Sequence, residues 1–178
     1  IGVPIAGSIG LAVFGVIIFS GQVCPVVVAQ AMIRQMGSFS LVAIPFFMLS
    51  GGIMEKSGIT QRLVDFADAV VGWITGGLAY VSIFSGMLMG GISGSGPADT
   101  AALGGILIPS MEKAGYPKEY ASATLAAAGS IGAIIPPSIT MVVLAGILSQ
   151  SVGSMLMAGL IPGILIGVLM MVTSGVIC

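Results

Sequence analysis

The fold of this chain is decided by one interrupted apolar stretch, Gly90-Gly91-Ile92-Ser93-Gly94-Ser95-Gly96-Pro97-Ala98-Asp99-Thr100. Apolar segments flank it, 77–89 before it and 101–108 after it. A continuous helix is disfavoured here, because glycine costs about 1 kcal/mol and proline about 3 kcal/mol relative to alanine in a helix interior. Irregular backbone at membrane depth must be buried by protein or line a wet cavity. We therefore interpret the stretch as the tip of a re-entrant hairpin that holds an ion or a substrate.

Composition sets the class of protein. Of the 178 residues, 57% are hydrophobic and only 6% are charged, whereas soluble domains carry about 25% charged residues. This balance predicts an all-α polytopic membrane protein that lies in a lipid bilayer. The net charge of −1 provides no basic surface, so we expect no nucleic-acid partner.

The rest of the chain is organised around the hairpin. We expect membrane spans plus an interfacial helix over 1–73, the re-entrant hairpin over 74–118, a discontinuous helix over 119–150 and a final span over 151–178. Within the first part, 1–20 and 38–54 have the length and the composition of bilayer crossings, and 21–37 is the interfacial helix. The chain begins and ends inside apolar runs, so we expect a fragment of a longer protein.

A charged helix is expected shortly before the hairpin. From Ile59 to Trp73, apolar residues recur every three or four positions, while Arg62, Asp65 and Asp68 fall on other faces. This period is helical and suits a helix that lies along the membrane surface. The same pattern also suits a helix packed across other helices of the protein, and the sequence leaves both interpretations open.

A second break is predicted in 129–138, where two consecutive prolines, Pro136 and Pro137, stop the helix. Proline pushes the preceding residue, Ile135, toward extended geometry. The two halves of a discontinuous helix offer unpaired carbonyl and N–H groups, which transporters use to hold cations and anionic substrates near the bilayer midplane. A simple proline kink is the alternative.

Asp99 is the one acidic residue placed inside an apolar segment. A carboxylate at membrane depth is costly, which makes it a functional candidate. Ser95, Pro97 and Asp99 also have the order of a helix start, with a cap followed by proline and an acid in the first turn. Asp99 can thus cap its own helix, support an ion site, or do both.

The positive charges indicate an orientation. If the hairpin re-enters the membrane, Lys56, Arg62, Lys113 and Lys118 share one side, and Arg34 alone lies near the other. Lysine and arginine accumulate on the cytoplasmic side. The hairpin is therefore expected to enter from the cytoplasm.

Five stretches together resemble the large membrane subunit of tripartite ATP-independent periplasmic (TRAP) transporters. Three carry most of the resemblance, namely 93–104 with Ser93-Gly94-Ser95-Gly96-Pro97-Ala98-Asp99-Thr100, 108–116, and 131–138 with Ile134-Ile135-Pro136-Pro137-Ser138. Two further stretches, 43–51 and 159–163, also fit. The similarity covers nearly the whole chain in the right order.

The resemblance implies secondary active transport rather than enzymatic activity. Members of this family import organic acids, such as C4-dicarboxylates or sialic acid, across the bacterial inner membrane with a sodium gradient and without ATP. A small membrane subunit and a periplasmic substrate-binding protein are the implied partners. The fold implied is an elevator transporter of two inverted repeats, each with a re-entrant hairpin and a discontinuous helix, and this chain matches the first repeat only.

The resemblance also implies an ion or substrate site and no cofactor other than Na⁺ as the coupling ion. Its candidate residues are Ser93, Gly94, Ser95, Gly96, Asp99, Thr124, Ser130, Gly132, Pro136, Pro137 and Ser138. Within this set, the expected Na⁺ ligands are Ser93, Gly94, Ser95, Gly132 and Pro136. Carbonyl and hydroxyl oxygens are suitable ligands for such a hard cation.

Three other functions are weaker. The segment Gly91-Ile92-Ser93-Gly94 has the spelling of an intramembrane serine-protease motif, but the chain has no histidine to activate the serine. A sodium-coupled carboxylate carrier that works without a periplasmic receptor remains the alternative. A channel would need rings of pore-lining residues, which the sequence does not show.

Overall fold

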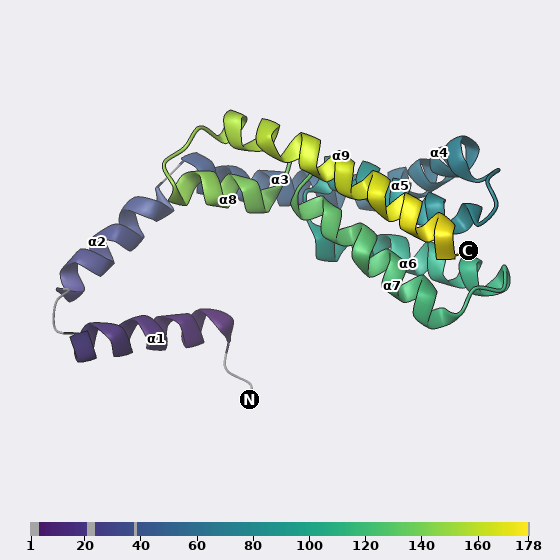
Figure 1. The fold of residues 1–178 in the computed structure, drawn as a ribbon. Coiled ribbons are helices and arrows are strands. Elements are labelled where there is room, and N and C mark those ends of the chain that lie inside the picture. Colours follow the sequence, from purple (N-terminus) through teal and green to yellow (C-terminus); the bar gives the residue numbers. More distant parts are fainter. Residues whose placement is uncertain (1–3, 21–23, 38, 178) are drawn as a thin grey trace. The chain divides into compact units, whose positions relative to one another are not determined.

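The computed structural model describes residues 4–20, 24–37 and 39–177, and these ranges contain helices and no strand. The chain divides into two compact units, Ile1–Ser38 and Phe39–Cys178. In order, the helices are α1 (Ile5–Ser20), α2 (Pro25–Met36), α3 (Phe39–Lys56), α4 (Ile59–Val71), α5 (Gly77–Ser93), α6 (Gly96–Lys113), α7 (Lys118–Ser130), the 3₁₀ turn η1 (Ile131–Ala133), α8 (Ile139–Ile147) and α9 (Val152–Ile177) (Figure 1). The all-α prediction is confirmed.

The first unit consists of α1 and α2. Helix α1 is uncharged and apolar on every side, and α2 carries Arg34 in its last turn. The predicted crossing over 1–20 corresponds to α1, which begins at Ile5. Residues 1–3 of the predicted crossing lie outside the described ranges. The predicted interfacial helix over 21–37 corresponds to α2.

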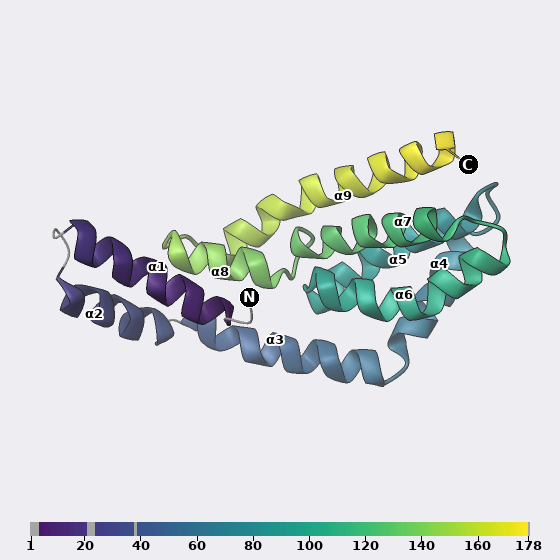
Figure 2. The same ribbon diagram turned by 90° about the horizontal axis from the view of Figure 1, so that it is seen from below.

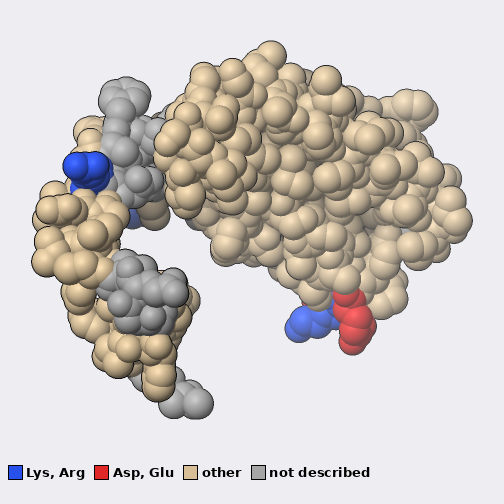
Figure 3. Space-filling view, turned by 60° about the vertical axis from the view of Figure 1, so that its left-hand side comes forward, with Lys and Arg blue, Asp and Glu red and all other residues tan. Residues whose placement is uncertain are grey.

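Among the described residues, one helix is both long enough and apolar enough to cross a membrane, the 26-residue α9. Helix α9 begins at Val152, close to residue 151, where the final span is predicted to begin. Ser154 lies in its first turn, where the carbonyl of Ser151 accepts the N–H of Met155 at 3.0 Å. The face seen in Figure 3 carries very few charged side chains, as expected for a protein surrounded by lipid.

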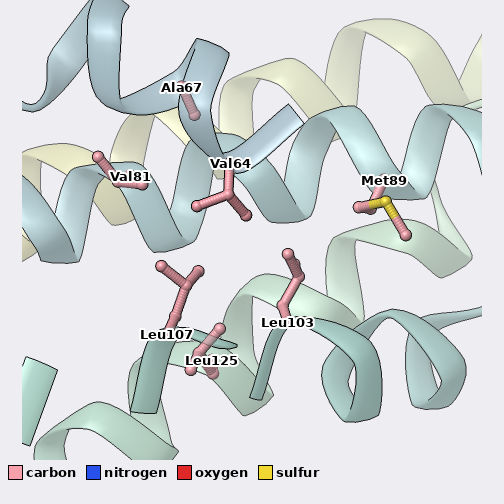
Figure 4. Packing of buried hydrophobic residues seen from close by; sticks show 7 residues of the cluster. All are labelled: Val64, Ala67, Val81, Met89, Leu103, Leu107 and Leu125. Carbon is pink, nitrogen blue, oxygen red and sulfur yellow. The ribbon is translucent and has the colours of Figure 1, made fainter. Parts of the chain in front are cut away.

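The core of the second unit lies between α4, α5, α6 and α7. Figure 4 shows its main cluster, formed by Val64, Ala67, Val81, Met89, Leu103, Leu107 and Leu125. The residues from α4 and from α6 are three or four positions apart and those from α5 are eight apart, so each of these helices buries one stripe, to which α7 adds Leu125. The cluster fixes α5 and α6 as an antiparallel pair against α7 (Figure 2).

Helix α4 packs against α5, so the packing interpretation of the charged helix is confirmed. The buried face consists of Thr60, Val64 and Ala67. The predicted apolar ridge is not that face, because Phe66 is half exposed and Trp73 is 81% exposed. Small side chains at the contact let the two helices approach. The bulkier ridge lies at the edge of this contact, where Leu63 packs against the core and the ring of Phe66 lies 6.4 Å from that of Phe84. Contact of this ridge with the membrane surface stays a prediction.

Glycines determine how closely α5 and α9 approach their neighbours. A Cβ atom built on Gly90 of α5 would lie 2.6 Å from the Cα of Gly132, and one on Gly86 would lie 2.9 Å from the Cβ of Ala128. On α9, a Cβ on Gly163 would lie 2.6 Å from a carbon of Ile135. Both glycine stripes therefore act as packing surfaces, as small residues do between membrane helices.

Gly90→Ala should separate α5 from η1, because the added methyl group has no room beside Gly132. We expect a loss of about 1–3 kcal/mol of stability, the usual cost of overpacking, measured as a lower thermal unfolding midpoint of the purified full-length protein. Gly105→Ala on α6 is the matched control, since its Cβ meets nothing within 4 Å. Equal midpoints for the two variants would contradict the close approach.

Candidate functional site

The turn of the α5–α6 hairpin contains fewer non-helical residues than the sequence predicts. Helix α5 continues to Ser93 and α6 begins at Gly96, so only Gly94 and Ser95 lie outside helical geometry. The prediction that the whole stretch from Gly90 opens was wrong. Close packing of the glycines outweighs their low helix propensity, and Pro97 is tolerated because it lies in the first turn of α6.

Gly94 ends α5 in the left-handed conformation, with φ of 63°, and its N–H donates to the carbonyl of Gly90 at 3.1 Å. Glycine is the usual residue for this type of helix end, because a side chain would be strained there. The hairpin turn is thus determined by the sequence itself.

The hairpin turn touches the second break, as predicted. The carbonyl of Gly94 accepts a hydrogen bond from the N–H of Ile139, the first residue of α8, at 3.3 Å. A Cβ atom on Gly94 would overlap the carbonyl oxygen of Pro137. Backbone therefore lies directly on backbone where the two interruptions meet.

The second interruption is a true break and not a proline kink. Helix α7 ends at Ser130, η1 covers the next three residues, and α8 begins only at Ile139. The α-helical geometry therefore ends inside the predicted stretch 129–138 and ahead of the two prolines. Gly132 is in close contact with Gly90, and α-helical geometry ends at Ser130, six positions before the first of the two prolines.

Ser138 holds the break together. Its hydroxyl donates to the carbonyl of Ala133 at 2.6 Å and accepts the N–H of Met141 at 3.3 Å. The side chain is therefore the N-cap of α8 and at the same time closes the loop across the prolines. Its proton and one lone pair are already used by the protein.

Asp99 lies between the hairpin turn and the break and is fully buried. Its Oδ1 accepts a hydrogen bond from the Ser93 hydroxyl at 2.5 Å. The Ser93 oxygen in turn accepts the N–H of Ser95 at 3.1 Å. Oδ2 lies against Gly132, where a Cβ atom would come within 2.7 Å of it. Ser95 makes no side-chain cap, so Ser93 and not Ser95 satisfies the turn.

A pocket of about 140 Å³ opens beside the hairpin turn. It is lined by Met48, Gly51, Gly52, Met89, Ser93, Ser95, Ala98, Asp99 and Ile139. Its polar side chains are two serines and one aspartate, all three of which belong to the predicted set. Oxygen donors beside a buried carboxylate form an arrangement that attracts a hard cation.

The remaining predicted residues do not line this pocket. Gly132, Pro136, Pro137 and Ser138 belong to the adjoining break, and Gly96 lies against the carbonyl of Gly129. Thr124 lines a different groove, between α7 and α9. Ser130 is exposed, and its hydroxyl donates to the carbonyl of Ala127 at 2.6 Å. The structure therefore brings the two breaks together but leaves Thr124 and Ser130 apart from them.

The α3 wall of the pocket, Met48, Gly51 and Gly52, was missed by the sequence reasoning. The sequence gives only a weak signal for this wall. Ser50, Gly51 and Gly52 form a run of small residues in the middle of a bulky apolar helix. In membrane proteins such runs mark places where another backbone comes close.

Comparison with known proteins identifies the family. A family model described as "Tripartite ATP-independent periplasmic transporter, DctM component" matches residues 1–177. The chain belongs to this family. The resemblance predicted from the motifs is therefore confirmed, and the DctM family is a family of membrane permeases.

Curated DctM-family relatives have several named substrates. The chain is similar to the C4-dicarboxylate TRAP transporter large permease protein DctM of Vibrio cholerae, with 40% identity over 97% of the chain. It is also similar to the sialic acid TRAP transporter large permease protein SiaM of that species, with 37% identity over 99% of the chain. The isethionate TRAP transporter permease protein DctMQ of Oleidesulfovibrio alaskensis is 41% identical over 98% of the chain.

The chain covers 38%, 42% and 27% of these relatives, respectively, and so spans about two fifths of their length or less. All three are named as transporter permeases, so the DctM-family chain is not an enzyme, as predicted.

Gly94→Ala should force the hairpin turn away from the break. The added methyl group is strained at positive φ, which costs roughly 1–2 kcal/mol, and it also overlaps the Pro137 carbonyl. Gly115→Ala is the matched control, because Gly115 has a φ of 91° and open space around it. We expect a larger fall in the thermal unfolding midpoint of the full-length protein for Gly94→Ala. Equal falls would show that the contact with Pro137 contributes nothing.

Proposed function

We propose that this chain is the N-terminal repeat of the large permease subunit of a TRAP transporter, which imports an organic acid with sodium across the bacterial inner membrane. One observation carries the proposal. In a DctM-family chain, a hairpin turn lies against a broken helix, and the buried carboxylate of Asp99 lies between them beside an open pocket. The relatives named for C4-dicarboxylates and sialic acid support an organic acid as the substrate.

The proposed sodium site uses oxygens from both breaks. Ser93, Gly94 and Ser95 supply hydroxyl and carbonyl oxygens from the hairpin turn, and Gly132 and Pro136 supply carbonyls from the break. Such oxygens replace the water shell of a hard cation. The contact between Gly94 and Ile139 supports this set, because it holds the two groups of carbonyls side by side.

Asp99 supplies the charge for this site. A buried carboxylate is costly in an apolar medium unless a cation or hydrogen bonds balance it. The hydrogen bond from Ser93 supports one oxygen, and Oδ2 faces Gly132 of the break. A sodium ion bound at the turn would offset the negative charge where it is buried.

The proposed membrane placement is multi-pass, with the hairpin entering from the cytoplasm. Helix α5 has 17 residues, so at 1.5 Å per residue it reaches about 25 Å, past the middle of a hydrocarbon core of about 30 Å. Lys113 and Lys118 lie at the opposite end of the hairpin from Gly94, and positive charges favour the cytoplasmic side.

The proposed transport step moves the hairpin and the break as one body. Glycine contacts join α5 and α6 to α7 and η1, at Gly90 with Gly132 and at Gly96 with Gly129. We propose that a second repeat completes the site, and that a small membrane subunit and a periplasmic substrate-binding protein are partners. The family description as a tripartite periplasmic transporter supports these partners.

The proposal is tested with the full-length permease, reconstituted in liposomes with its small subunit and its binding protein. Uptake of a radiolabelled C4-dicarboxylate or of sialic acid should require an inward sodium gradient and should saturate. Equal uptake with potassium in place of sodium would overturn sodium coupling. Equal uptake without the binding protein would favour a receptor-free carrier.

Ser95→Leu should abolish sodium-driven uptake, because a bulky side chain would fill the pocket beside Ser93 and Asp99. Ser122→Leu on α7 is the matched control, since Ser122 is exposed and lies outside the pocket. Both variants are compared by initial uptake rate per reconstituted protein. Undiminished uptake by Ser95→Leu would refute the site.

Asp99→Asn keeps the shape of the side chain and removes its charge. A unit charge within a few ångströms of the ion contributes several kcal/mol at partly buried sites, so the sodium concentration for half-maximal uptake should rise on the order of tenfold or more. The sodium dependence of uptake measures this shift. An unchanged half-saturation would remove Asp99 from the ion site.

A further inference from the structure

Helix α3 contributes a wall to the pocket, and the proposed function does not explain it. Gly51 and Gly52 line the same pocket as Ser93, Ser95 and Asp99. The two glycines differ in their surroundings. A Cβ atom on Gly51 would lie 3.5 Å from the Cα of Ser93, whereas one on Gly52 would meet nothing within 4 Å. Gly51 is therefore a contact residue, and Gly52 faces open space.

The open space at Gly52 is not required for helix packing. Elsewhere in the second unit, glycines such as Gly90 and Gly163 are needed because another segment lies where a side chain would be. A helix glycine without such a contact costs about 1 kcal/mol relative to alanine and gains nothing from packing. At Gly52 the volume is left free beside polar groups.

The free volume connects exposed and buried parts of the pocket. Ala98 is exposed, Ser93 and Ser95 are half-buried, and Asp99 is fully buried, although all four line the same space. The pocket of about 140 Å³ has room for several water molecules, since each needs roughly 10–15 Å³ of such volume, and the two serines and Asp99 provide polar partners for them. Water, or a cation with part of its water shell, can thus approach the carboxylate from the Ala98 side.

We infer that Gly52 of α3 determines the size of this pocket, and that the absence of a side chain there keeps open the path by which a small hydrated cation reaches Asp99. The inference rests on the proposed sodium coupling and adds a residue from outside the two breaks. A side chain at position 52 would project into the pocket and occupy the volume that the cation and its water need.

The experiment uses a cysteine reporter in the full-length permease with its native cysteines replaced. Ala98→Cys is labelled with a charged, membrane-impermeant methanethiosulfonate reagent, and the labelling rate is measured with glycine, alanine or leucine at position 52. Gly105→Leu on α6 is the matched control, because Gly105 also faces open space but lies outside the pocket. Sodium-dependent uptake is measured for the same position-52 variants without the reporter.

Gly52→Leu should slow labelling by about tenfold and raise the sodium concentration for half-maximal uptake, because it fills a void next to the buried carboxylate. Gly52→Ala should give a smaller change in the same direction, and Gly105→Leu should change neither quantity. The alanine variant keeps the test decisive if the leucine variant does not fold.

Unchanged labelling in the position-52 variants would overturn the inference. Slower labelling with an unchanged sodium half-saturation would also overturn it, because the pocket would then not be the cation path. Uptake by the unaltered permease that does not depend on sodium would refute the proposed function instead. In that case the labelling rates still decide whether Gly52 governs the pocket.

Discussion

The second unit depends on direct contact between two stretches of backbone. The carbonyl of Gly94 bonds to the N–H of Ile139, and Gly90 presses on Gly132. No side chain fits between the hairpin turn and the break at these points. Because both interruptions expose main-chain polar groups in an apolar protein, each supplies what the other needs, and neither would be stable facing lipid alone. The buried carboxylate of Asp99 is acceptable for the same reason, since it lies where these polar groups gather.

Much of this arrangement could be predicted from the sequence. Four glycines and a proline before Ala98, and two prolines after Ile135, marked both interruptions, and their meeting follows from the cost of open backbone in lipid. The number of non-helical residues in each interruption could not be predicted. Gly90 and Gly91 look like helix breakers but remain helical, because the close packing of Gly90 against η1 outweighs their intrinsic propensity. The end of α7 at Ser130 depends on the same tertiary contact.

Which residues belong to the site was harder to predict than where the site lies in the fold. Thr124 and Ser130 precede the break by only a few residues, but the helical turn directs Thr124 toward α9 and leaves Ser130 exposed. A shift of one residue rotates a helix position by about 100°, so an error of one residue in a helix boundary places a side chain on a different face of the helix. Gly52 is some forty positions away from the hairpin turn and carries no polar group, so the run of small residues around it is the one signal that marks it.

Helix α9 is joined to α7 near one end and to the break near the other, and this has a mechanical consequence. Near one end, the hydroxyls of Tyr120 and Ser174 lie 2.6 Å apart. Near the other, the backbone of α9 at Gly159 and Gly163 rests on Ile134 and Ile135. A helix held at two separated points resists sliding better than a helix held at one. The break is therefore held by α5 at Gly132 and by α9 at Ile134 and Ile135.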